Sequence, residues 1–196
     1  MLHIDTLTLG AYQVNCYIVR REDSDRCVVI DPGYEPGRIL AYLQKNNLQL
    51  EAILLTHGHF DHVGGVRELA ADTDCQVYMR PEEELLPPQI TAGQLFYTNR
   101  YPEGGQLQIA GMDFLVLHTP GHTPGSVCLL TGDVIFSGDT LFAGSCGRTD
   151  FPGGNMADML TSLQNLRDLP ANYRVFPGHA EATSLEAERR SNPYMQ

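Results

Sequence analysis

The chain has 196 residues, of which 42% are hydrophobic, and a formal net charge of -11 from 13 basic and 24 acidic residues. This length and composition fit one globular domain with a sizeable core. The excess of acidic residues disfavours nucleic acid and anionic membranes as partners, because clustered basic residues supply most of the affinity for both.

The amino-terminal segment and the cysteines indicate a cytoplasmic protein. The first residues, MLHIDTLTLG, lack the basic start and apolar block of a signal peptide. No apolar run approaches the roughly 20 residues that span a bilayer. The 5 cysteines are widely spaced and form no CxxC pair. We therefore expect reduced thiols rather than disulfides.

The first half of the chain alternates predicted strands and helices. Short apolar runs and period-two patterns predict strands, and apolar residues three and four apart predict helices. The expected strands cover residues 2–9, 15–20, 27–30 and 52–55, and the expected helices cover 36–46 and 63–71. The segment THGHFDH, residues 56–62, therefore forms a strand-to-helix loop, a place where functional side chains often lie.

The second half repeats this organisation. The expected strands cover residues 114–117, 126–130, 134–136 and 173–176, and the expected helices cover 156–169 and 181–190. Two similar halves of strands and helices predict two sheets packed face to face, with helices outside.

Four of these strands deliver a histidine or an aspartate into a loop that contains Gly or Pro. If the four strand ends meet at one edge of the sandwich, seven candidate metal ligands converge there. They are His57, His59, Asp61, His62, His118, Asp139 and His179. Imidazole nitrogen and carboxylate oxygen suit zinc, iron or manganese.

Seven ligands exceed the four of a structural zinc site and fit two divalent metal ions. Zinc is the expected metal, with iron and manganese as alternatives. Asp139 is the expected bridge, because a carboxylate has two oxygens that can face two ions. Two metals about 3.5–4 Å apart can hold a hydroxide near neutral pH, and such a hydroxide is a hydrolytic nucleophile.

The motif THGHFDH, followed by His118, Asp139 and His179 at strand ends, resembles the HxHxDH motif and downstream ligands of the metallo-β-lactamase superfamily. The segment IDPG, with Asp31, resembles the first motif of that family. The resemblance extends over nearly the whole chain. It implies an α+β fold, a four-layer αββα sandwich of two mixed sheets with the metal site at one edge. It also implies a single hydrolase domain over residues 1–196.

The resemblance gives each candidate a role. It implies that His57, His59 and His118 hold the first metal, that Asp61, His62 and His179 hold the second, and that Asp139 bridges them. Asp61 and Asp139 are then the catalytic residues, and Asp61 could also take a proton. Asp31 is expected to support the metal loop. His122 lies off the ligand pattern, so we expect it to hold a loop next to the site.

Three segments are most similar to the short, single-domain relatives of glyoxalase II. They are GDTLFAGSCGRTDFPGGN at 138–155, TPGHTPGSV at 119–127, and the carboxyl-terminal residues 176–195. Glyoxalase II hydrolyses the thioester S-D-lactoylglutathione and holds glutathione with a helical carboxyl-terminal domain, which we do not expect in this protein. The expected substrate is therefore a small-molecule thioester, with or without a glutathione carrier. In the expected reaction a metal polarises the thioester carbonyl and the bridging hydroxide attacks it.

Arg148 aligns with a basic residue that contacts glutathione in these relatives, so it is the candidate substrate-binding residue. An equally weighted alternative is that Arg148 pairs with Asp150 and shapes the loop. The segment 89–101, with Phe96 and Tyr97, could cover the site or form the contact of a homodimer.

Two other functions stay open at this point. The segment CGRTDF also resembles the persulfide dioxygenases, in which only His57, His118 and Asp139 would bind a single iron. A non-catalytic metal-binding module is the third interpretation. The complete ligand set disfavours that module, because a degenerate copy is expected to have lost ligands.

Overall fold

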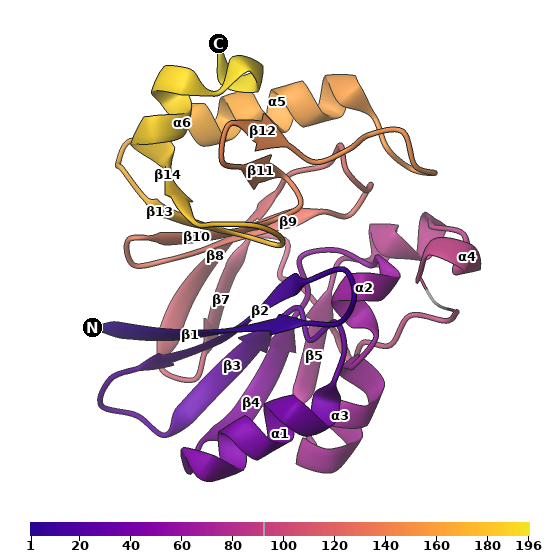
Figure 1. The fold of residues 1–196 in the computed structure, drawn as a ribbon, viewed down its shortest axis with the longest axis vertical. Coiled ribbons are helices and arrows are strands. Elements are labelled where there is room, and N and C mark those ends of the chain that lie inside the picture. The colour runs from indigo at the N-terminus through magenta and orange to yellow at the C-terminus, as the bar shows by residue number, and fades with distance from the viewer. Residues whose placement is uncertain (92) are drawn as a thin grey trace.

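The computed structural model describes residues 1–91 and 93–196. Two six-stranded sheets pack face to face, and helices cover the outer face of each sheet (Figure 1). The predicted αββα sandwich is therefore confirmed. Within the described residues, no helix combines the length and the apolar character needed to cross a membrane.

The first sheet contains the strands of the amino-terminal half. In spatial order they are β1 (Leu2–Leu9), β2 (Val14–Arg21), β3 (Arg26–Ile30), β4 (Gln49–Leu54), β5 (Gln76–Met79) and β6 (Asn99–Arg100). Strands β1 to β3 pair antiparallel, and β3 to β6 pair parallel. Parallel neighbours need crossover connections. The helices α1 (Pro36–Lys45), α2 (Phe60–Val63) and α3 (Val66–Thr73) lie in these connections.

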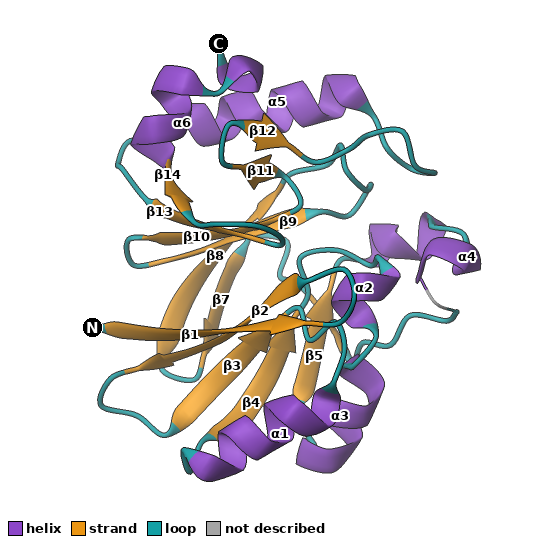
Figure 2. Cartoon of the chain, viewed as in Figure 1, coloured by secondary structure: helices purple, strands orange, loops and turns teal. Residues whose placement is uncertain are grey.

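The second sheet contains the strands of the carboxyl-terminal half. In spatial order they are β14 (Thr183–Ser184), β13 (Arg174–Pro177), β10 (Val134–Gly138), β9 (Val127–Thr131), β8 (Met112–His118) and β7 (Gln106–Ile109). Only β10 and β13 pair parallel, and α5 (Met156–Arg167) connects them. Helix α6 (Leu185–Ser191) contacts α5, so both lie outside this sheet (Figure 2).

Short elements complete the chain. They are the 3-10 helices η1 (Pro81–Leu85) and η2 (Pro193–Met195), the helix α4 (Pro88–Thr91), and the hairpin β11 (Leu141–Phe142) and β12 (Ser145–Cys146). The five cysteines are free thiols, and four of them are buried, in agreement with the sequence.

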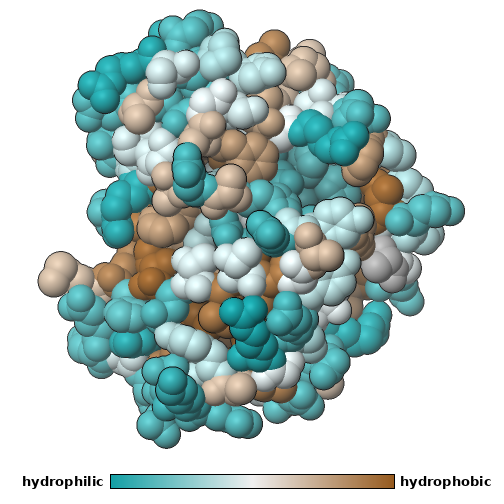
Figure 3. Space-filling model, in the orientation of Figure 1, coloured by the Kyte–Doolittle hydropathy of each residue, from teal (hydrophilic) through white to brown (hydrophobic). Residues whose placement is uncertain are grey.

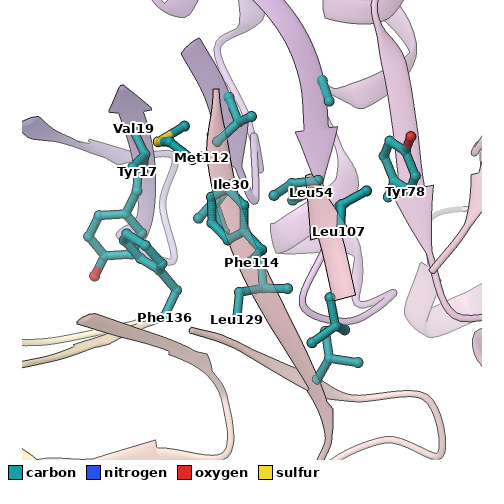
Figure 4. Close-up of a cluster of buried hydrophobic side chains, with 14 of the residues drawn as sticks. Tyr17, Val19, Ile30, Leu54, Tyr78, Leu107, Met112, Phe114, Leu129 and Phe136 are labelled. Atoms are coloured by element: carbon teal, nitrogen blue, oxygen red, sulfur yellow. The ribbon is translucent and has the colours of Figure 1, made fainter. Parts of the chain in front are cut away.

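Alternation along the strands divides the core into three layers. On β2, Tyr17 lies in the cluster between the sheets, whereas Ile18 lies in the cluster that contains residues of α1 and α3. On β10, Phe136 faces the other sheet and Ile135 lies in the cluster with α5. Figure 4 shows the layer between the sheets, where Tyr17 and Phe136 lie side by side with ring centroids 5.1 Å apart. Burying each such side chain stabilises the fold by about 1.5–3 kcal/mol.

The outer surface in the view of Figure 1 is mostly hydrophilic, and hydrophobic residues gather in the band where the two sheets meet (Figure 3). Strand directions decide what lies at the sheet edges. Because β8 and β10 both run antiparallel to β9, and β13 runs parallel to β10, these three strands end at the same edge. The loops that follow them carry the candidate ligands.

Candidate metal centre

The loops after β4, β8, β10 and β13 meet at one edge of the sandwich. The loop after β4 carries His57 and His59 and runs into α2, whose first residues include Asp61 and His62. His179 is the second residue after the end of β13, and Gly178 lies between them. The convergence of strand ends predicted from the sequence is present.

Three histidines form one buried group. The donor nitrogens of His57, His59 and His122 all lie within 4.8 Å of one another. His59 Nδ1 lies 2.8 Å from His122 Nε2. The ring centroid of His57 lies 4.9 Å from that of His59 and 4.8 Å from that of His122. Three imidazoles so arranged can share one metal ion.

A second group lies beside the first. His179 Nε2 is 3.2 Å from Asp61 Oδ2 and 3.3 Å from His62 Nε2. One ligand atom from each of these three residues lies within 4.8 Å of the others. Two nitrogens and a carboxylate oxygen can hold a second divalent ion.

Asp139 lies between the two groups. Its Oδ1 is 3.5 Å from His62 Nε2, and its Oδ2 is 3.5 Å from His122 Nε2 and 3.7 Å from His179 Nε2. One carboxylate therefore faces donors of both groups, which is the place expected for a bridging ligand.

Unpaired buried atoms test whether a metal fits these residues. His57 Nε2, His59 Nε2 and Asp139 Oδ1 are buried and have no hydrogen-bond partner. Buried polar atoms are normally paired, so three unpaired atoms in one cluster need an explanation. His57 Nδ1 lies 3.1 Å from Thr56 Oγ1, which leaves Nε2 as the nitrogen that faces the site. A divalent cation would satisfy His57 Nε2 and Asp139 Oδ1, whereas His59 turns its Nδ1 toward His122 Nε2 and would bind through that nitrogen.

The other ring nitrogens are held by oxygen acceptors. His122 Nδ1 donates to the Arg148 carbonyl at 2.8 Å, and His179 Nδ1 donates to the Tyr12 carbonyl at 3.1 Å. His62 Nδ1 donates to Asp31 Oδ2 at 2.9 Å. Each bond fixes the ring and leaves Nε2 with a lone pair for a metal.

Asp31 joins the metal loop to β3. Its Oδ1 accepts from the Thr56 backbone N–H at 2.8 Å, and its Oδ2 accepts from Thr56 Oγ1 at 2.6 Å as well as from His62. The side chain thus contacts the loop before His57 and the helix that follows it. This is the supporting position that the family resemblance implies for Asp31.

Glycine lets the loops approach closely. A Cβ at Gly178 would lie 2.3 Å from Asp139 Oδ1 and 2.7 Å from His62 Cε1. The loop is held from the other sheet by Asn15, whose Nδ2 donates to the carbonyls of Pro177 at 3.1 Å and Ala180 at 2.9 Å. Sequence reasoning missed Asn15, because a strand asparagine gives no signal of a partner 162 residues away.

The electrostatics differ between the two groups. Burial lowers the pKa of His57, and burial together with neighbouring histidines lowers the pKa of His59 to about 4. Burial also opposes protonation of His62, but the carboxylates of Asp139 and Asp31 outweigh it and raise its pKa to about 9. The first group is therefore neutral at pH 7 and ready to bind a cation.

Asp61 is ionised in this environment. Burial raises its pKa, but the hydrogen bond from His179 and the nearby His62 outweigh burial and lower the pKa to about 2. In the second group, protons on histidines balance the carboxylates. A metal ion would replace those protons.

His118 and His122 exchange the roles expected from the sequence. His118 is exposed, and its Nε2 donates to the Pro124 carbonyl at 2.8 Å, so it closes the loop between β8 and β9. His122, four residues further on, is buried within the ligand cluster. The prediction of His118 as a ligand and of His122 as the loop-holding residue is therefore wrong. The signal was present, since His122 and His179 both end a Pro-Gly-His tripeptide.

Arg148 adopts the alternative arrangement. Its Nε lies 2.7 Å from Asp150 Oδ1, and its guanidinium lies 3.7 Å above the centroid of the Phe151 ring. The carbonyl of Arg148 also accepts from His122. The geometry thus favours a loop-shaping residue, and its contact with substrate stays a prediction.

Aromatic side chains border the centre. The Phe151 ring lies 6.0 Å from His59, and the Phe142 ring lies 6.5 Å from His179. Tyr12 packs edge-on against Phe60 at 5.1 Å. Together these four residues form an aromatic rim.

The segment 89–101 includes Ala92, which lies outside the described residues. Phe96 and Tyr97 pack against the cluster on the outer face of the first sheet, and Tyr97 Oη donates to Glu84. The expected role of this segment as a cover or a dimer contact stays a prediction.

Residues 9–179 match the sequence model of the metallo-beta-lactamase superfamily. This chain belongs to that superfamily. Among curated relatives, hydroxyacylglutathione hydrolase GloC of Haemophilus influenzae is 34% identical over 209 residues, covering 99% of this chain and 98% of the relative. A hydroxyacylglutathione hydrolase of Enterobacter sp. is 39% identical over 176 residues, covering 90% of this chain and 66% of the relative.

Solved structures agree with this family. The B3 metallo-beta-lactamase BLEG-1 superposes with a TM-score of 0.91 at 32% identity, covering 99% of this chain and 100% of the other. TTHA1623 in a di-iron-bound form superposes with a TM-score of 0.84 at 40% identity, covering 97% of this chain and 99% of the other. ETHE1 from Myxococcus xanthus superposes with a TM-score of 0.85 at 30% identity, covering 97% of this chain and 83% of the other.

Proposed function

We propose that this chain is a hydrolase that binds two divalent metal ions and cleaves thioesters of the glyoxalase II type. The observation that carries the proposal is the arrangement of two donor groups around Asp139, with the buried atoms His57 Nε2 and Asp139 Oδ1 unpaired. An ion pair network alone would not leave such atoms without partners.

Each donor group would hold one ion. The first ion would be held by His57, His59 and His122, the second by Asp61, His62 and His179, with Asp139 shared between them. When bound, two such ions polarise a carbonyl oxygen and lower the pKa of a coordinated water. We expect zinc, with iron or manganese as alternatives.

The remaining residues orient and shield the reacting groups. Hydrogen bonds from Nδ1 keep His62, His122 and His179 in one orientation. Asp61 stays ionised and could accept a proton during the reaction. The aromatic rim offers apolar faces to an acyl group.

A thioester is the substrate class that the relatives favour. GloC of Haemophilus influenzae carries the name of a hydroxyacylglutathione hydrolase, and this chain covers 98% of it. The free thiols suit a reaction in the cytoplasm. Because Arg148 is paired with Asp150, the thiol carrier need not be glutathione.

The test is hydrolysis of two thioesters by metal-loaded protein. One is S-D-lactoylglutathione, and the other carries the same acyl group on a thiol without carboxylates. We expect metal-dependent release of thiol from at least one of them and loss of that activity with a chelator. Protein that holds two ions per chain and cleaves neither thioester would contradict the proposal.

The second candidate function is persulfide dioxygenation at a single iron. It is supported by the segment CGRTDF and by the structural similarity to ETHE1 from Myxococcus xanthus. In this structure His122 would take the place expected of His118 in such a site. Oxygen uptake with a persulfide, by protein that contains one iron per chain, would replace the hydrolase proposal.

A further inference from the structure

A buried glutamate lies between the two loops that supply the three-histidine group. Glu83 belongs to η1, and its side chain has 0% exposure. His57 and His59 follow β4 of the first sheet, whereas His122 lies between β8 and β9 of the second. The position of His122 relative to the other two therefore depends on what holds these loops together.

The carboxylate of Glu83 contacts both loops. Its Oε2 accepts a hydrogen bond from the backbone N–H of Gly58, the residue between His57 and His59. Its Oε1 accepts from the backbone N–H of Gly125, three residues after His122, at 2.6 Å. Bonds from N–H groups to an ionised carboxylate are roughly twice as strong as bonds between neutral groups.

Both contacts require glycine. A Cβ at Gly58 would lie 2.9 Å from Glu83 Oε2, and a Cβ at Gly125 would lie 2.7 Å from Oε1. Two loops from different sheets thus approach one carboxylate more closely than any other residue would permit. The arrangement fixes the two loops at one separation.

This carboxylate is not explained by stability alone. In the parts of the chain that the structure describes, no basic side chain forms an ion pair with Glu83. Burial raises the pKa of Glu83 in spite of its hydrogen bonds, which means that its charge is costly in this place. A buried carboxylate without a basic partner is unfavourable, and such features are expected where function requires them.

We propose that Glu83 is a positioning residue that sets the separation of His57 and His59 from His122, and so tunes the affinity of this group for a divalent metal. The inference rests on the metal centre of the proposed function. It adds to that centre a residue that binds no metal and does not belong to any of the family motifs found in the sequence.

The test is a titration of metal-free protein with Co²⁺, followed by its visible absorption. Glu83→Gln preserves the shape of the side chain but places an NH₂ group opposite one backbone N–H. Glu84→Gln is the matched control, because Glu84 is the exposed neighbour. We expect Glu83→Gln to lower the affinity for one of the two ions about tenfold, which corresponds to the loss of one charge-assisted hydrogen bond. The second ion and the control should keep wild-type affinity.

A second variant keeps the inference testable if Glu83→Gln folds poorly. Gly125→Ala presses a methyl group against Glu83 Oε1. It should lower the affinity for the same ion and alter the cobalt absorption bands. Wild-type affinity for both ions in Glu83→Gln or Gly125→Ala would overturn the inference and leave the proposed function intact. A wild-type chain that binds no ion would overturn both.

Discussion

At the scale of single residues, the difference between His118 and His122 decides the ligand set. His118 is the last residue of β8 and His122 lies in the loop after it, because the chain needs the turn at Pro120 and Gly121 to bring a side chain back to Asp139. Gly121 has a φ of 141°, which few other residues adopt. Sequence spacing predicted a ligand in this loop, but strand-end position alone could not show which histidine reaches the cluster.

Alanine substitutions at these two histidines test the assignment. We expect His122→Ala to lose one metal ion per chain, because it removes a buried donor of the first group. His118→Ala removes only an exposed hydrogen bond, so it should keep full metal content and lose about 0.5–1.5 kcal/mol of stability. Elemental analysis of both variants checks this. Metal loss in His118→Ala with retention in His122→Ala would restore the assignment made from the sequence.

The raised pKa of Glu83 gives a pH dependence with a definite sign. The unfolded chain releases this proton near the ordinary value of 4.5, and the folded chain releases it at higher pH. Between these values the folded state holds the extra proton, so the free energy of unfolding falls as pH rises. Glu83→Gln lacks this contribution.

The stability of metal-free wild-type protein relative to metal-free Glu83→Gln should therefore decrease as the pH rises above the ordinary carboxyl value of 4.5. Urea unfolding of both chains across this range measures the difference, in which all other titrating groups cancel. A constant difference would show that folding leaves the pKa of Glu83 unchanged, and an increasing difference would show that folding lowers it; either result would contradict this prediction.

At the scale of elements, the loops after the strands are positioned by contacts across the two sheets. Strand β2 holds the loop after β13, since Asn15 Nδ2 and Tyr17 Oη both donate to the Pro177 carbonyl. Helix α5 holds the loop that carries His122, because Ser162 Oγ donates to the Pro120 carbonyl at 2.7 Å. None of these partners is close in sequence, so no local pattern could reveal them.

Most element positions were predictable, and the exceptions have local causes. The helix expected over 63–71 is interrupted at Gly64 and Gly65, where the chain passes close to the Pro32–Gly33 turn. The strands β5, β6, β7, β11, β12 and β14 were missed, because runs of two to four residues carry too little periodicity. The helix expected over 181–190 begins only at Leu185, after β14.

Gly178→Ala tests the close approach of the loops. The added Cβ would meet Asp139 Oδ1 at 2.3 Å, so the Asp139 carboxylate has to move. We expect loss of at least one metal ion and a large loss of hydrolase activity. The matched control is Gly104→Ala, since a Cβ at Gly104 has no neighbour within 4 Å. Equal metal content in both variants, measured by elemental analysis, would contradict the described packing.

At the scale of the whole molecule, the centre joins the two halves of the sandwich. The first sheet and its helices supply His57, His59, Asp61 and His62, and the second sheet supplies His122, Asp139 and His179. Two similar halves in the sequence predicted this architecture, and the family resemblance gave the edge at which they meet. The pairing of the halves is long-range and therefore depends on burial rather than on local signals.

Metal removal should therefore destabilise the whole fold. At a free metal concentration 1,000 times Kd, each ion adds about 4 kcal/mol of stability. For a chain of this size, that corresponds to a rise in Tm of roughly 8–16 °C. Calorimetry of metal-loaded and chelated protein measures the shift. Identical Tm values would mean that metal does not connect the two sheets.

The most direct test of the central claim is the metal content per chain of protein purified without added metal. The account predicts close to two divalent ions per chain, because two donor groups share Asp139. A single iron per chain, with no second ion taken up on addition of zinc or manganese, would contradict it.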